Sequence, residues 1–281
     1  VYNVQAYLDS CINSVLNQSY ANWELVLVND GSTDSSAHIC QQYADKDSRI
    51  QLVHQENRGL LSARRTGIKQ ARGEYLLFLD SDDFLATDLL AYLHAIIQEH
   101  AHIDLILFNY KKVNMSGQFM YENKNPFGKT DEVYSIHRTL LRNTFLEGNK
   151  LNPLWLKVVH RKLMQKDQCD YLRFGRLMQA EDRLQSLPLI WQAQKAIYID
   201  RAFYHYRTNP VSTSFNFRRQ NFDDTLRVEI EMERFLIAAQ AENAYVTKSY
   251  AYTMYAIVGA YLRLISSNSF SRLEKLKIIH E

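Results

Sequence analysis

The stretch "YLLFLDSDDF", residues 75–84, places five apolar residues directly before three carboxylates in four positions. A short apolar run of this kind is typical of a strand that is buried on both faces of a parallel sheet. Asp80, Asp82 and Asp83 repel one another, so we expect a positive charge beside them. Mg²⁺ in proteins takes one or two carboxylates together with the phosphates of a substrate, so the pattern predicts a site for a metal and a diphosphate. The alternative is that Asp82 or Asp83 caps the helix that follows.

The residues around this stretch alternate between strand-like and helix-like patterns with short connections. Apolar positions at helical spacing predict a helix over 8–16, and Ser32 or Thr33 is placed to cap the helix that follows "DGSTD". The segment "LLSARRTGIKQA" predicts another helix, ended by Gly73 in the left-handed conformation. The remaining expected elements are strands at 24–29, 50–54, 75–79 and 104–110 and a helix at 89–97. Such alternation predicts right-handed crossovers and a mostly parallel sheet.

The pattern changes after residue 110. A polar, turn-rich segment follows, then helical patterns at 136–146 and 154–164, and mostly helix-like sequence from about residue 222. We therefore expect an α/β fold, with a mostly parallel, Rossmann-like sheet flanked by helices and with a helical C-terminal region. The expected parts are residues 1–110, 111–220 and 221–281.

The composition excludes some classes of protein. Hydrophobic residues make up 46% of the 281 residues, as in globular proteins with a sizeable core. The 33 Lys and Arg residues nearly balance the 31 Asp and Glu residues, whereas nucleic-acid-binding proteins usually show a basic excess, so we expect no nucleic-acid partner. The three cysteines match no zinc spacing and indicate a reducing compartment.

No apolar run reaches the roughly 20 residues that a membrane-spanning helix needs. The nearest is "YAYTMYAIVGAYLRLI", residues 250–265, which Arg263 interrupts. We expect a buried helix there, with contact to a membrane surface as the alternative. The chain begins at Val1 without an initiator Met, and we expect that a segment preceding Val1 is missing.

Four motifs together resemble a known family. They are "VYN" at 1–3, "NDGSTD" at 29–34, "NRGLLSARRTGI" at 57–68 and "GEYLLFLDSDD" at 73–83. Their order and spacing resemble family 2 glycosyltransferases with the GT-A fold, densely over residues 1–110 and more thinly to about 215. Arg65 stands where the family more often has Asn. The strand and Pro that normally precede "VYN" are absent, which agrees with a missing preceding segment.

The resemblance implies roles in binding a nucleotide-sugar donor. Tyr2 resembles the loop that contacts the base, and Asp30 resembles the carboxylate that accepts a hydrogen bond from a uracil imide. Arg64 resembles a residue that faces the nucleotide or its diphosphate. The alternatives are an Asx-type turn for Asp30 and an exposed helix charge for Arg64.

The resemblance also implies a metal site. Asp80 resembles the ribose-side Asp of the D-x-D motif and Asp82 resembles its metal ligand, with Ser81 between them in the donor site. The segment "FYHYRTNPVSTS" resembles a late family motif, in which His205 or Arg207 meets the metal or the diphosphate. We take His205 as a candidate metal ligand, with a structural role as the alternative.

The segment "QAEDRLQS" resembles the family motif whose Asp is the catalytic base, here Asp182. Glu181 would lie beside the base and contact the acceptor. The family often has an aromatic residue shortly after this Asp, where this chain has Leu184 and Gln185. The alternative is a pair of acids at a helix start, which the helix dipole favours.

The resemblance implies an inverting hexosyl- or N-acetylhexosaminyltransferase. It would use a nucleotide-sugar donor, with a UDP-sugar favoured, Mn²⁺ or Mg²⁺, and a glycan or lipid-linked saccharide as acceptor. The implied location is the cytoplasm, with peripheral contact to the cytoplasmic membrane face, in polysaccharide assembly for the cell envelope. The alternatives are a metal-dependent nucleotidyltransferase and a catalytically silent carbohydrate-binding module. A nucleotidyltransferase would need a Gly-rich phosphate loop early in the chain, and none is visible there. A silent binding module is disfavoured by the intact Asp30, Asp82 and Asp182.

Overall fold

The computed structural model describes residues 1–128, 132–167, 169–208, 219–266, 271 and 274. Its first part alternates helices and strands, and each strand and helix predicted there is present. The elements are α1 Gln5–Leu16, β1 Leu25–Asp30, α2 Ser36–Lys46, β2 Ile50–Gln55, α3 Leu60–Gln70, β3 Tyr75–Leu77, β4 Phe84–Leu85, α4 Leu89–Glu99 and β5 Leu105–Val113.

The second part mixes short strands with helices. Its elements are β6 Phe119–Glu122, β7 Val133–Ile136, α5 Arg138–Leu146, the 3₁₀ turn η1 Leu154–Leu156, β8 Lys157–His160, α6 Arg161–Gln165, the 3₁₀ turn η2 Tyr171–Phe174, α7 Glu181–Gln192, β9 Ala196–Arg207, α8 Arg219–Ala238 and α9 Asn243–Ser266. The helix predicted over 154–164 is wrong at its centre, which is β8. Val158 and Val159 pair with both β3 and β5 inside the sheet, and this burial outweighs the helical spacing.

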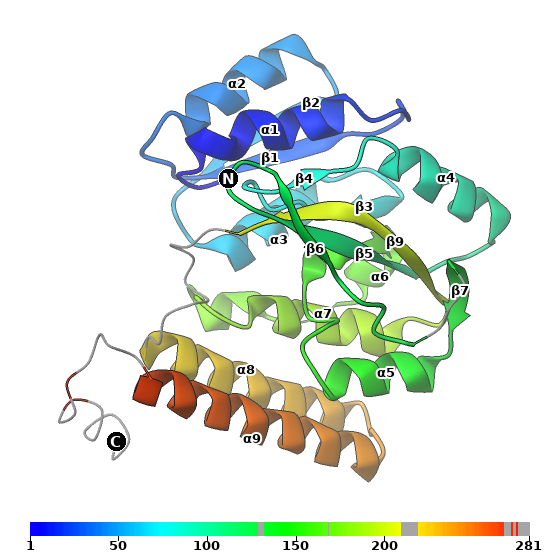
Figure 1. Ribbon diagram of the computed structural model, residues 1–281, viewed down its shortest axis with the longest axis vertical. Coiled ribbons are helices and arrows are strands. Elements are labelled where there is room, and N and C mark those ends of the chain that lie inside the picture. Colours follow the sequence, from blue (N-terminus) through cyan, green and yellow to red (C-terminus); the bar gives the residue numbers. More distant parts are fainter. Residues whose placement is uncertain (129–131, 168, 209–218, 267–270, 272–273, 275–281) are drawn as a thin grey trace.

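The central sheet is mixed. Its strand order is β3-β8-β5-β9-β4, with β6 beside β5 and β7 beside β9, while β1 and β2 form a separate parallel pair. Helices flank the strands (Figure 1), which confirms the expected α/β fold. Besides β1 and β2, only β5 and β9 pair in parallel among the described strands, so the sheet is not mostly parallel. Most of the antiparallel strands come from the second part, where the sequence patterns are short.

Two predictions about helix ends are wrong. Ser32 and Thr33 do not cap α2, because they bond to the first loop: the Ser32 hydroxyl accepts from the Asn3 N–H at 3.3 Å, and Asn3 Oδ1 accepts from the Thr33 N–H at 2.8 Å. Gly73 does not end α3 in a left-handed conformation, and its N–H donates to Glu24 Oε1 at 2.6 Å. These residues hold neighbouring loops together.

Helices α8 and α9 form a hairpin that packs against α5 and α7 (Figure 1). The prediction of a buried helix over 250–265 is wrong for one face of α9. Ala260 and Leu264 are buried, whereas Met254, Tyr255 and Leu262 are each at least 60% exposed. Within the described residues, no helix is both long enough and apolar enough to span a membrane.

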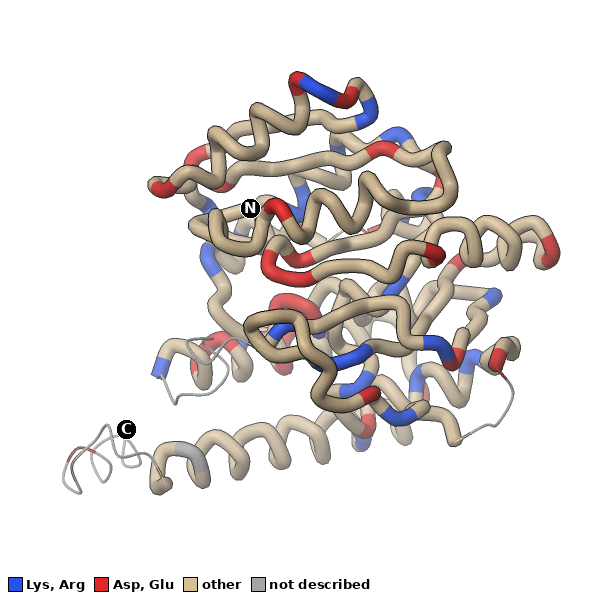
Figure 2. The backbone as a smooth tube through the Cα atoms, turned by 45° about the horizontal axis from the view of Figure 1, so that its top comes forward, with Lys and Arg blue, Asp and Glu red and all other residues tan. Residues whose placement is uncertain are grey.

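Charged residues are spread over the fold. Figure 2 shows acidic and basic positions interspersed along the described backbone in this view. This distribution agrees with the near balance of charge in the sequence.

Candidate active site

Asp80, Asp82 and Asp83 form an acidic cluster in the turn between β3 and β4. Asp83 is buried and accepts hydrogen bonds from the Tyr204 hydroxyl and the Arg207 N–H, both at 2.7 Å. These bonds tie the turn to β9. Helix α4 begins several residues later, so neither Asp82 nor Asp83 caps it and that alternative is excluded.

The carboxylate of Asp82 accepts from its own backbone N–H and, within the described part of the chain, from no other residue. Burial, followed by the charge of Asp80, raises the pKa of Asp82 to about 6. Burial, followed by the charge of Asp82, also raises the pKa of Asp83 well above its usual value. A cation beside Asp82 would therefore stabilise the charged cluster. Among the described residues no group of three or more His, Cys, Asp or Glu side chains is placed to hold a metal ion.

Arg64 connects the acidic cluster to an acid from the second half of the chain. It lies on α3, is only 7% exposed, and donates to Asp80 Oδ1 at 3.0 Å and to Asp182 Oδ1. Burial lowers the pKa of Arg64, but the carboxylates of Asp182 and Asp80 outweigh burial and raise the pKa above its ordinary value. The alternative of an exposed helix charge is excluded, and Arg64 instead bridges residues from distant parts of the sequence.

Asp182 and Glu181 begin α7. The helix N-terminus favours negative charge there, and Arg64 adds a direct partner for Asp182. Burial, followed by the charge of Asp182, raises the pKa of Glu181 to about 7. A buried carboxyl group with a raised pKa beside a second acid is a common feature of functional sites.

Asp30 ends β1 and is buried. Its carboxylate accepts hydrogen bonds from the Arg58 N–H at 2.9 Å, the Gly59 N–H at 2.8 Å and the Gln55 amide at 2.6 Å. These partners are distant in sequence, so Asp30 does not form a local Asx-type turn. It fixes the loop that enters α3, and one of its roughly four lone-pair positions remains for a further donor.

Tyr2 and Arg176 lie beside this loop. Tyr2 is 40% exposed, and the guanidinium carbon of Arg176 is 5.9 Å from the centre of its ring. Gly59 has a φ of +86°, and a Cβ there would lie 2.9 Å from Arg176 Cγ, so the close approach requires glycine. Arg176 comes from the second half of the chain, so the two halves meet beside Asp30.

Within the described residues no hydrogen bond or ion pair joins His205 to the acidic cluster, and its role as a metal ligand stays a prediction. Its ring stacks on Phe84 with the centroids 4.6 Å apart. Burial, followed by the charge of Lys111, lowers the pKa of His205. Side chains alternate along a strand, so where Tyr204 faces Asp83 the next residue faces away. The end of this predicted motif, at 209–214, lies outside the described residues.

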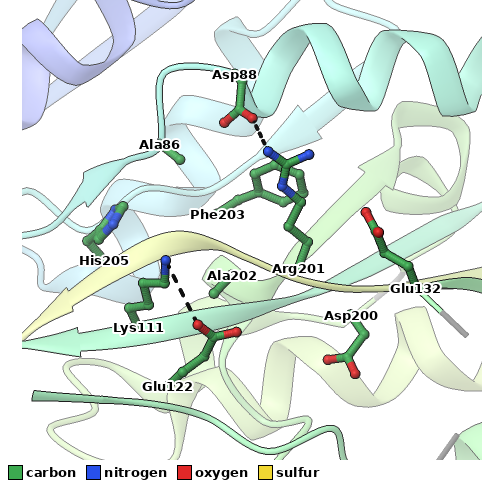
Figure 3. Close-up of a pocket in the computed structure, with 10 residues that line it drawn as sticks. All are labelled: Ala86, Asp88, Lys111, Glu122, Glu132, Asp200, Arg201, Ala202, Phe203 and His205. Carbon is green, nitrogen blue, oxygen red and sulfur yellow. Dashed lines mark hydrogen bonds and ion pairs between the residues drawn. The ribbon is translucent and has the colours of Figure 1, made fainter. Parts of the chain in front are cut away.

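His205 lines an open cavity of about 490 Å³ (Figure 3). The cavity is bounded by the segment between β4 and α4, by β5, β6 and β9, and by Glu132. Charged groups of the cavity pair with each other, Asp88 with Arg201 and Lys111 with Glu122. The acidic cluster and Asp182 do not line it. We therefore place the candidate site at the Arg64 bridge and not in this cavity. Ser81 lies at that site, half-buried in the turn of the cluster.

Sequence reasoning missed Lys157, which is fully buried at the start of β8. Its ammonium group donates to the carbonyl oxygens of Leu151 and Pro153, both at 2.6 Å. Burial lowers the pKa of Lys157 to about 7, and the charge of Asp182 opposes that shift. A lysine inside the apolar run "LWLKVV" was the available signal. Lys157 thus fixes the loop before β8, close enough to Asp182 for the two charges to interact.

We expect Lys157 to make the stability of the fold rise with pH. Its folded-state pKa of about 7 lies below its ordinary value of 10.5, so between these values the unfolded chain binds a proton that the folded chain lacks. Raising the pH through this window therefore stabilises the fold. The free energy of unfolding of the wild type, minus that of Lys157→Met, should rise by about 1.4 kcal/mol per pH unit from about pH 7.5 to 9.5. Urea denaturation at several pH values measures this difference. A difference that does not change with pH would show that Lys157 stays protonated in the folded state.

The fold resembles that of solved glycosyltransferases. The crystal structure of S. aureus TarS 1–349 in complex with UDP matches 90% of this chain and 68% of that chain, with a TM-score of 0.68 and 24% identity. A mannosyltransferase from Pyrobaculum calidifontis in complex with GDP-Man and Mn²⁺ matches 100% and 76% of the two chains, with a TM-score of 0.58 and 16% identity. These likenesses show the fold, which is the GT-A fold that the sequence motifs indicate.

The family follows from the sequence itself. The family model "Glycosyl transferase family 2" matches residues 1–167, more than half of this chain, and the chain therefore belongs to that family. Glycosyltransferase GlyA from Streptococcus pneumoniae is 34% identical over 217 residues, which are 76% of this chain and 30% of GlyA. The putative glycosyltransferase EpsH from Bacillus subtilis is 30% identical over 227 residues, which are 80% of this chain and 64% of EpsH. The chain thus spans less than two thirds of the length of both relatives.

Proposed function

We propose that this protein transfers a sugar from a nucleotide-sugar donor to a hydroxyl group of an acceptor, with inversion at the anomeric carbon. The observation that carries the proposal is the Arg64 bridge, which joins Asp80 of the acidic cluster to Asp182. An inverting transfer needs a base for the acceptor hydroxyl and stabilisation of the leaving diphosphate. The bridge supports the proposal because it brings Asp182, the candidate base, next to Arg64 and the acidic cluster, the candidates for stabilising the leaving diphosphate.

We infer a UDP-sugar as donor and Mn²⁺ or Mg²⁺ as the cation. Proteins with the same fold are found in complex with UDP, and with GDP-Man and Mn²⁺. Asp82 would hold the cation, which would neutralise charge on the leaving diphosphate. The other donor contacts would come from Tyr2 and Asp30 at the base, Asp80 and Ser81 on the ribose side, and Arg64 at the diphosphate.

Asp182 would accept the proton of the acceptor hydroxyl. Arg64 holds its carboxylate by a charge-assisted hydrogen bond, which fixes the direction of the side chain. Because Arg64 also contacts Asp80, a diphosphate bound beside Asp80 would compete for the guanidinium group. That competition would leave Asp182 freer to take a proton once the donor is in place. Glu181, the neighbour of the base, would contact the acceptor.

We propose a glycan or lipid-linked saccharide as the acceptor. Family membership supports this class of acceptor. We also propose a cytoplasmic location with peripheral contact to the cytoplasmic membrane face, in polysaccharide assembly for the cell envelope. The apolar residues exposed on α9 would suit such a contact.

A panel of nucleotide sugars, with Mn²⁺ present and released nucleotide measured, tests the proposed function. Release of UDP from a UDP-sugar is the expected result. Release of pyrophosphate from a nucleoside triphosphate would indicate a nucleotidyltransferase. Saccharide binding without turnover of any donor would indicate a silent binding module.

We expect Asp30→Ala to weaken UDP binding by about 1.5–3 kcal/mol, the range for a hydrogen bond to a charged group. Because Asp30 also fixes the Gly59 loop, CDP is the control: its base lacks the imide N–H but needs the same loop. Calorimetry should show a larger loss for UDP than for CDP. Equal losses would mean that Asp30 acts through the loop and does not select the base.

A further inference from the structure

We propose that helix α8 positions the candidate base, because two of its buried carboxylates, Asp224 and Glu229, hold the chain on both sides of Asp182. This inference rests on the proposed function of Asp182. Helix α8 lies beyond residues 1–167, the part that the family model matches. Figure 1 shows α8 packed along α7, the helix that begins with Asp182 and its neighbour.

The backbone directly before the acids of α7 is strained. Ala180 has φ 64° and ψ 8°, the left-handed conformation, which costs free energy for any residue with a Cβ. Such a conformation persists only where the surrounding structure enforces it. The contacts on either side of Ala180 therefore decide where α7 starts and how Asp182 is presented.

On the N-terminal side, α8 holds the segment that leads into Ala180. Asp224 is buried, and its Oδ2 accepts a hydrogen bond from the Met178 N–H at 2.7 Å. One turn further, Arg227 donates to the Phe174 carbonyl oxygen at 3.2 Å. Gln220 donates to Asp224 Oδ1 at 2.8 Å, so the carboxylate that receives Met178 is itself held in place.

On the C-terminal side, α8 holds the residue after Asp182. Arg183 and Glu229 form a buried ion pair, with Arg183 Nε 2.6 Å from Glu229 Oε1. The hydroxyl of Thr253 on α9 donates to Glu229 Oε2 at 3.2 Å, and the Arg183 guanidinium carbon lies 3.7 Å from the centre of the Tyr252 ring. Both helices of the hairpin therefore fix Arg183.

This arrangement sets the rotation of α7. Successive residues of an α-helix are about 100° apart, so fixing Arg183 toward α8 turns Asp182 toward a different neighbour, which is Arg64. A buried ion pair adds little net stability compared with apolar residues of similar size. Directional bonds to Asp224 and Glu229 do supply what apolar packing lacks, a defined orientation of the first turn of α7.

Glu229→Gln and Asp224→Asn test the proposal, with Glu233→Gln as the matched control. Glu233 is on the same helix, but it bonds to Tyr250 of α9 and not to α7. We expect the two test variants to lower kcat on the order of a hundredfold, the cost of a small misplacement of a reacting group, with donor affinity unchanged. Amide hydrogen exchange over residues 176–184 should become faster in both, and Glu233→Gln should leave kcat and that exchange unchanged.

A second variant covers the case in which Glu229→Gln leaves Arg183 charged and unpaired and the protein fails to fold. Arg183→Met combined with Glu229→Met removes both charges, so it should fold and still show low kcat and fast exchange. Unchanged exchange over residues 176–184 in the folded variants would overturn the inference. Normal kcat in the folded variants, together with a slow Asp182→Asn variant, would also overturn the inference. That result would leave the proposed function standing. If Asp182→Asn itself is fast, the proposed base is wrong, and the exchange result still decides whether α8 holds the turn.

Discussion

Asp182→Asn should slow sugar transfer by at least about a hundredfold while leaving the affinity for the UDP-sugar near that of the wild type. General-base catalysis is typically worth about 10²–10⁴ in rate, and Asn keeps the size of Asp but cannot take the proton. Binding should survive because the proposed base and ribose contacts are made by other residues. Steady-state kinetics should therefore show a fall in kcat with little change in donor KM.

Asp88→Asn is the control for this substitution. It makes the same chemical change in an ion pair with Arg201, away from the Arg64 bridge, and should leave transfer unchanged. An Asp182→Asn variant with wild-type kcat would remove Asp182 from the mechanism. Loss of donor binding in that variant would instead make Asp182 a structural partner of Arg64.

Asp82→Ala should lower the metal-dependent affinity for UDP by at least about 10–100-fold, the effect that even indirect partners of a metal show. The Asp82 carboxylate accepts no hydrogen bond from another described residue, and its pKa is raised to about 6 by burial and then by Asp80. Its removal relieves repulsion, so the fold should remain intact. Calorimetry with UDP and Mn²⁺, before and after EDTA, measures the effect.

Asp83→Ala distinguishes an effect on stability from an effect on metal-dependent binding. Asp83 accepts hydrogen bonds from Tyr204 and Arg207. Its loss would leave these buried donors unpaired, and each unpaired donor costs about 1–3 kcal/mol of folding free energy. This variant should therefore lose stability more than it loses metal-dependent binding. UDP affinity that does not change with EDTA in the wild-type protein would contradict the metal role of Asp82.

The first half of the fold could be predicted from the sequence because its signals are local. The apolar run of β3 and the acids that follow stand side by side in the chain, and so do the helical spacings of α1 and α3. The second half depends on contacts between distant residues. Strand β8 follows a helix-like pattern, yet it lies between β3 and β5, and nothing in residues 157–160 alone indicates that position.

The candidate site was predictable in its residue types but not in its connections. The motifs pointed to Arg64, Asp80 and Asp182 separately, and only the fold shows that one guanidinium joins the two acids. The role of His205 as a metal ligand stays a prediction, because a motif names residues and does not say which face of a strand they occupy. Lys157 carried one weak signal, a charge in an apolar run.

The anomeric configuration of sugar released from an α-linked UDP-sugar tests the central claim most directly. Water can replace the acceptor, so ¹H NMR of the first product needs no knowledge of the natural acceptor. One base beside one diphosphate site predicts that the β-anomer appears first. Its formation should be lost with EDTA and slowed by at least about a hundredfold in Asp182→Asn. First appearance of the α-anomer, or no cleavage of any nucleotide sugar, would contradict the account.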